Sequence, residues 1–214
     1  MKSLSEDQVA RREKTLITAL LLSMWAPLTT GIAVILSRSN TQLADFIRRT
    51  VELIAMFISW RVFRYVEKGR DVDAEQKARL EKIAGLSVAG ALGISGIIMF
   101  IITGTRIDTF EPGGNVYPGL AIAILGLAVN SWFWRRYAKM TVEHYNPVID
   151  SQRLMYQAKA VVDFCVILAL SAVAIAPTAP ATRYIDALGS VAVAFYLIWS
   201  GINTLKTALK NPPS

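Results

Sequence analysis

Residues 39–66, with the sequence SNTQLADFIRRTVELIAMFISWRVFRYV, decide the fold of this chain. The segment has the length and apolar character of a membrane helix. Ionisable side chains nevertheless interrupt its first half: Asp45, Arg48, Arg49 and Glu52. In a helix Asp45, Arg48 and Glu52 share one face, because residues three or four apart are neighbours. Charged groups inside a membrane helix are costly and indicate a functional site. The alternative is that the first of them lie at the membrane interface and point outward.

The composition of the whole chain agrees with a membrane protein. It has 214 residues, of which 53% are hydrophobic, and a mean hydropathy of +0.40. Soluble domains average about 45–50% apolar residues with charge spread along the chain, whereas here the charges cluster between long apolar runs. The net charge of +7 follows from basic residues that flank apolar spans, so we expect the lipid bilayer as partner and no nucleic acid.

Six apolar spans of about 20 residues occur along the chain, which is the length that an apolar helix needs to cross a bilayer. They cover residues 16–36, 43–66, 83–105, 117–137, 154–176 and 185–207. Connections rich in Pro, Gly and polar residues separate them, and no segment has the pattern of a strand. We therefore predict an all-α membrane protein. Its parts are a cytoplasmic N-terminal segment 1–14, a six-helix transmembrane domain 15–208 and a short cytoplasmic tail 209–214.

The distribution of Lys and Arg predicts the orientation in the membrane. The N-terminal segment, the second-to-third and fourth-to-fifth connections and the tail carry most of these residues. The connections on the opposite side carry Arg38, Arg106 and Arg183. We therefore predict an integral membrane protein with both termini in the cytoplasm, and we expect the membrane to be a bacterial inner (plasma) membrane.

The fifth span repeats the charge pattern of the second span. Lys159 precedes Asp163 by four residues, as Arg48 precedes Glu52, so each pair lies on one helix face. Four ions can be buried in lipid only if they pair or are hydrated. We therefore predict that the second and fifth helices pack together with these four residues between them.

The second helix resembles that of the cation diffusion facilitator (cation efflux) family, whose pattern reads S-x-x-x-x-A-D-x-x-[H/D]-x-x-x-D. Ser39, Ala44 and Asp45 match this pattern. Arg48 stands where the family has its first metal ligand, and Glu52 stands at the position of its second ligand.

The fifth and sixth helices resemble the same family. Lys159 stands at the His position of the family's H-x-x-x-D helix and Asp163 at its Asp position, although a register shifted by four would pair Met155 with Lys159. Asp186 opens a helix similar to the family's sixth, which often begins with an aspartate. The resemblance covers residues 15–208 in span order and loop length.

The resemblance implies a divalent metal cation/proton antiporter that exports a metal such as zinc, with no resident cofactor. It implies Asp45, Glu52 and Asp163 as binding groups. Arg48 and Lys159 alter this metal site, because arginine offers no acceptor and an acid nearby keeps a lysine protonated. Family members also continue into a cytoplasmic metal-binding domain after the sixth helix, which this sequence does not contain.

Two other functions remain open from the sequence. One is a non-transporting membrane scaffold or partner subunit held together by a buried ion-pair cluster. The other is a carrier of an anion or organic ion that Arg48 and Lys159 would bind. We expect no enzyme, because the chain has no phosphate-binding loop or nucleophile motif. The single histidine, His144, follows Glu143 on a cytoplasmic connection and is more typical of a solvated surface.

The resemblance also implies a homodimer. Four glycines of the third span would let helices approach closely: Gly85, Gly90, Gly93 and Gly96. Three small residues, Gly85, Ala89 and Gly93, have the spacing that favours contact between membrane helices. The alternative is that these glycines serve packing within one chain.

Overall fold

The structure is a computed structural model that describes residues 5–37, 40–68, 72–106, 117–175 and 180–210. Within these ranges the chain forms six helices and no strand. The helices are α1 (Glu6–Ser37), α2 (Asn40–Lys68), α3 (Ala74–Arg106), α4 (Tyr117–Glu143), α5 (Pro147–Ile175) and α6 (Pro180–Lys210). The all-α prediction is confirmed for this part of the chain.

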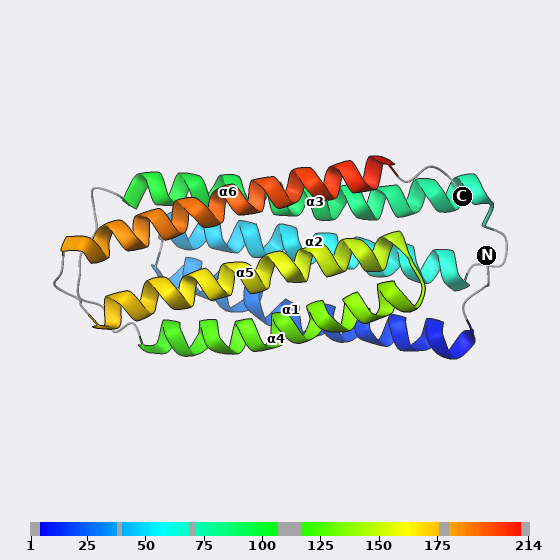
Figure 1. Cartoon of the computed structure of the whole chain (residues 1–214), viewed down its shortest axis with the longest axis horizontal. Coiled ribbons are helices and arrows are strands. Elements are labelled where there is room, and N and C mark those ends of the chain that lie inside the picture. Colours follow the sequence, from blue (N-terminus) through cyan, green and yellow to red (C-terminus); the bar gives the residue numbers. More distant parts are fainter. Residues whose placement is uncertain (1–4, 38–39, 69–71, 107–116, 176–179, 211–214) are drawn as a thin grey trace.

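The helices form two layers of three (Figure 1). In one layer α2 lies between α1 and α3, and in the other α5 lies between α4 and α6. The layers face each other through α3 and α6 and through the central helices α2 and α5. The first turn of α1 and the last turn of α6 lie at the same end of the bundle (Figure 1). The two central helices, which carry the predicted charges, are therefore the ones most enclosed by others.

Side-chain caps explain where several helices begin. Ser5 and Gln8 form a capping box, in which the Gln8 amide donates to Ser5 Oγ (3.3 Å) and the Ser5 amide donates to Gln8 Oε1 (3.1 Å). Asp73 Oδ1 accepts a hydrogen bond from the Gln76 amide (2.6 Å) before α3. Asn146 Oδ1 accepts bonds from the first amides of α5, which opens with Pro147. The cap at Ser5 explains why α1 begins at Glu6, so that residues 6–14 of the predicted N-terminal segment are helical and continue into the first span.

Four of the helices in the described residues are long and apolar enough to cross a membrane: α1, α3, α5 and α6. Large apolar side chains cover their outer surfaces, including Trp25, Ile97 and Phe195. Such a continuous exposed apolar surface indicates contact with lipid. Six predicted spans thus correspond to six helices, and four of these have the hydropathy of a membrane span.

Two glycines of the third span, Gly85 and Gly96, face α6, whereas a Cβ added at Gly90 or Gly93 would meet nothing within 4 Å. A Cβ added at Gly96 would lie 2.9 Å from the backbone oxygen of Ala194, and one at Gly85 would lie 2.7 Å from Ala208 Cβ. A Cβ at Gly201 of α6 would lie 2.9 Å from the backbone nitrogen of Gly93. Only glycine allows backbones to approach this closely. A homodimer remains a prediction, and the face with Gly85, Ala89 and Gly93 is covered by the chain's own sixth helix.

Candidate functional site

The centre of the polar cluster is the carboxylate of Glu52 on α2, which is 8% exposed. Its Oε1 atom accepts hydrogen bonds from Arg48 Nη1 (3.2 Å) and from Ser95 Oγ of α3 (3.1 Å). Its Oε2 atom is bound by the ammonium of Lys159 of α5, with Nζ at 3.1 Å. Three helices therefore supply donors to one buried carboxylate, which compensates the cost of removing its charge from water.

Lys159 reaches Glu52 across the two layers of the bundle. Its side chain is 17% exposed, and its Nζ atom also lies 3.9 Å from the sulfur of Met56 and 5.4 Å from the ring centre of Tyr156. The ring and the sulfur are both favourable neighbours for a cation. Lys159 therefore pairs with an acid of another helix. The ion pair joins α5 to α2, and the prediction that the central helices meet at these charges is correct for Lys159 and Glu52.

Asp163 is held by α4 instead. Asn130 Nδ2 donates a hydrogen bond to Oδ2 of Asp163 (2.6 Å). One turn before Asn130, a Cβ added at Gly126 would lie 2.9 Å from the same oxygen, so the missing side chain makes room for the carboxylate. Three cations act on Asp163 electrostatically: Lys159, Arg48 and Arg49. The fourth member of the predicted quartet thus belongs to the cluster but rests against α4.

The contacts between α2 and α5 follow a regular antiparallel register. Gln152 Nε2 donates to Ser59 Oγ (2.9 Å), and one turn further along α5 the Tyr156 hydroxyl contacts the sulfur of Met56 (3.9 Å). The pair Lys159 and Glu52 follows at the next turn. Each step of one turn up α5 corresponds to one turn back along α2, which explains how Arg48 and Asp163 come to lie in the same region.

Comparison with known protein families gives a clear result on this fold. The profile described as the cation efflux transmembrane domain matches residues 16–211. The chain belongs to the cation efflux family. The match runs from residue 16, within α1, past the end of α6, and it makes the chain a member of a family of membrane proteins that transport metal cations. No curated protein matches the chain in a sequence search.

Several predicted site residues lie elsewhere or outside the described side chains. Asp45 belongs to α2 and Asp186 to α6, but their side chains lie outside the described part of the structure. Met155, the alternative partner in the shifted register, is fully buried in the apolar core. His144 lies after α4, where its ring nitrogen Nδ1 is 3.1 Å from the backbone oxygen of Tyr145. Neither Met155 nor His144 joins the charge cluster.

Among the described residues, the groups that contact the Glu52 carboxylate are two protein cations and a serine hydroxyl. Among the described side chains, no three His, Cys, Asp or Glu residues come together in a way that could hold a metal ion. Both oxygens of Glu52 already face protein cations, namely Arg48 and Lys159. A guanidinium has no lone pair to offer a metal, and an ammonium has none while it stays protonated. The described groups form an internally neutralised cluster.

Sequence reasoning missed three residues that complete the cluster: Ser95, Asn130 and Gly126. Asn130 was visible as an amide in the middle of an uncharged span, and a polar side chain at such a depth indicates a buried hydrogen bond. Ser95 had a weaker signal, because serine is common in membrane helices and often bonds its own backbone. Gly126 had none, because its role depends on which side chain faces it.

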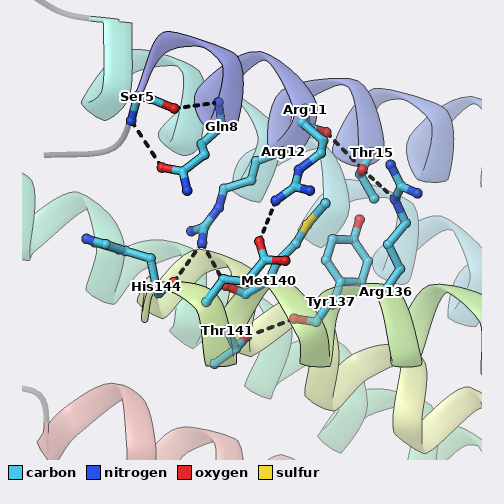
Figure 2. A network of polar contacts seen from close by, with 11 residues as sticks. Ser5, Gln8, Arg11, Arg12, Thr15, Arg136, Tyr137, Met140, Thr141 and His144 are labelled. Carbon is cyan, nitrogen blue, oxygen red and sulfur yellow. Dashed lines mark hydrogen bonds and ion pairs between the residues drawn. The ribbon is translucent and has the colours of Figure 1, made fainter.

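A second polar network joins α1 to the end of α4 (Figure 2). Arg12 is 1% exposed, and its Nη2 atom donates to the backbone oxygens of Met140 (2.6 Å) and His144 (2.8 Å). Arg136 Nε donates to Thr15 Oγ1 (2.9 Å) in the same network (Figure 2). The last carbonyls of a helix lack partners within it and carry partial negative charge, so a guanidinium stabilises them. Arg12 thus fixes α1 against the end of α4.

Proposed function

We propose that this chain is a membrane carrier for cations in which Glu52 is the central binding group and Lys159 is a cation built into the protein. The single observation that carries the proposal is the position of the Lys159 ammonium on Oε2 of Glu52, between the two helical layers. A cation that enters the site would take the place of Lys159 on this oxygen. Membership of the cation efflux family supports transport rather than catalysis.

The finer assignments of the proposal follow from the family and the sequence. The substrate is a divalent metal ion such as zinc, exchanged for protons, with Asp163, Glu52 and Asp45 as the acidic groups that bind it. The chain works as a homodimer of six-span subunits in a bacterial inner membrane, with both termini in the cytoplasm. Carboxylates serve both ions, because they bind hard cations when ionised and take up protons when the metal leaves.

The test is flux in proteoliposomes, with an internal zinc indicator and an internal pH indicator. We expect the wild type to move zinc inward and protons outward when zinc is added outside. Glu52→Gln and Asp163→Asn should abolish both signals in protein that still elutes as a folded species. Glu143→Gln is the matched control, because Glu143 is a partly exposed carboxylate that pairs with Arg11 on the surface. Equal flux in the wild type and in Glu52→Gln would refute the proposal.

The second candidate function is a non-transporting membrane scaffold or partner subunit. It is favoured by the observation that both oxygens of Glu52 already have donors within the protein, from Arg48, Ser95 and Lys159. A cluster with a donor on each oxygen of Glu52 holds the helices together through bonds within the protein. Zero flux in the wild type, together with strong destabilisation on removing Lys159, would favour this candidate over the carrier. A carrier for anions is favoured less, since Arg48 and Lys159 both bind Glu52.

A further inference from the structure

We propose that Asp163 of α5 is a second acceptor for the Lys159 ammonium. Asn130 and Gly126 of α4 hold its carboxylate in place. When Lys159 moves from Glu52 to Asp163, it uncovers Oε2 of Glu52 for an incoming cation. This use of Oε2 rests on the carrier function proposed above, whereas the exchange of Lys159 between two acids is tested separately from transport.

Lys159 has two carboxylates within reach. It now binds Oε2 of Glu52 at 3.1 Å, and it lies four residues before Asp163 on α5. Side chains four residues apart on a helix have Cβ atoms about 5–6 Å apart, so a lysine can bridge to an aspartate there. Lys159 already acts on Asp163 electrostatically. Rotation about the side-chain bonds of Lys159 would exchange one pairing for the other.

Asp163 has one carboxylate oxygen that could accept the Lys159 ammonium. Asn130 Nδ2 binds Oδ2 at 2.6 Å, and Gly126 leaves room for the same oxygen. Within the described residues no hydrogen bond reaches Oδ1, and the side chain is partly exposed. Asn130 therefore fixes the carboxylate against α4. The hydrogen bond from Asn130 also weakens the attraction between Asp163 and Lys159, because it already compensates part of the negative charge of the carboxylate.

Glu52 would stay bound to Arg48 and Ser95 when Lys159 leaves. Arg48 Nη1 and Ser95 Oγ both bind Oε1, at 3.2 Å and 3.1 Å, while in the described part of the chain Lys159 is the donor to Oε2. Departure of the ammonium thus uncovers one oxygen and leaves the carboxylate held in place by the other. A preorganised anionic oxygen among helices is a binding position for a metal ion or a proton.

The experiment detects Lys159 directly. Protein labelled with 15N-lysine is placed in nanodiscs, and the Nζ resonance of Lys159 is identified by its loss in Lys159→Met. We expect two Lys159 resonances in exchange. Asp163→Asn should remove one of them and Glu52→Gln the other. A single resonance that Asp163→Asn leaves unchanged would overturn the proposal.

Two substitutions in α4 test whether Asn130 and Gly126 position the carboxylate of Asp163. Asn130→Leu and Gly126→Ala both break the hydrogen bond to Asp163, the second because the new Cβ would collide with Oδ2. Each should raise the population ratio of the Asp163-paired to the Glu52-paired form by about two- to tenfold, the range set by one hydrogen bond. Gly90→Ala is the matched control, because a Cβ there meets nothing within 4 Å. A fall in this ratio, or no change, would overturn the role of Asn130 and Gly126.

Flux measured on the same samples separates the two proposals. Two resonances without zinc or proton flux would support the exchange of Lys159 and refute the carrier function. Flux together with a single, unresponsive Lys159 resonance would support the carrier and refute the exchange.

Discussion

Lys159 binds Glu52 of another helix, at 3.1 Å, rather than Asp163 one turn away on its own helix. The bond spans the interface between the two three-helix layers and connects their central helices, α2 and α5. A lysine that paired within α5 would leave Glu52 with Arg48 and Ser95 alone. The choice of partner therefore determines whether the charge of Lys159 stabilises one helix or holds two layers together.

Removing one member of this ion pair should destabilise the protein strongly. Glu52→Gln or Lys159→Met leaves the opposite charge buried without its partner, which should cost about 3–5 kcal/mol. Replacing Arg48, Glu52, Lys159 and Asp163 together with apolar residues of similar size should cost much less, because no uncompensated charge remains. Thermal unfolding in mild detergent measures the difference. Small effects of both single changes would contradict a buried ion pair.

Restoring histidine at the two basic positions should create a metal site. Arg48→His with Lys159→His replaces two cations by nitrogen ligands beside the carboxylates of Glu52 and Asp163, a ligand set that suits zinc. We expect zinc to bind this variant more tightly than the wild type, as measured by isothermal titration calorimetry. Arg48→Gln with Lys159→Gln is the control, since it removes the same charges without adding a good ligand. Equal affinity of the histidine variant and this control would contradict the predicted geometry.

Close packing of α3 on α6 should make small changes there costly. Gly96→Ala would place a Cβ 2.7 Å from Ile198 Cγ1 and 2.9 Å from the Ala194 backbone oxygen, so we expect a loss of about 1–3 kcal/mol. Gly90→Ala adds the same methyl group on the same helix with nothing within 4 Å. It should be neutral or stabilising, because alanine favours a helix over glycine. Similar melting temperatures for the two variants would contradict this packing.

Arg12 should contribute more to stability than its neighbour Arg11. Arg12→Ala removes two hydrogen bonds from a buried cation to backbone oxygens of Met140 and His144, with an expected loss of about 1.5–3 kcal/mol. Arg11→Ala removes a partly exposed ion pair with Glu143, with an expected loss of about 0–1 kcal/mol. Thermal unfolding of both variants provides the comparison. A larger loss for Arg11→Ala would contradict the contact of Arg12 with the end of α4.

The predicted orientation can be tested by labelling single cysteines in intact cells. After Cys165→Ala removes the native thiol, Asn115→Cys and Thr178→Cys should react with a membrane-impermeant maleimide, while Asp73→Cys should react only after the cells are opened. Asn115 and Thr178 lie outside the described residues, and Asp73 caps α3. The reverse pattern would contradict the placement of both termini in the cytoplasm.

The number and kind of the helices, and the charged residues within them, could be predicted from the sequence. Apolar runs of membrane length separated by breakers are local signals, so they predict α1 to α6 without knowledge of contacts. The spacing of Arg48 and Glu52, and of Lys159 and Asp163, was equally visible, because four residues on a helix always share a face. The family resemblance drawn from these short motifs was confirmed by the match over residues 16–211.

The pairing of the charges could not be predicted from the sequence, because it depends on how the helices pack. Lys159 has an acid within reach on its own helix and another on α2, and the sequence contains both pairings equally well. The antiparallel register of α2 against α5 places Glu52 beside Lys159. On the other side, α4 places Asn130 and Gly126, which has no side chain, against Asp163. The same holds for the glycines of α3, whose contact with α6 depends on how the two layers meet. Spacing along a helix fixes a face, but the partner of that face is set by packing between residues far apart in the chain.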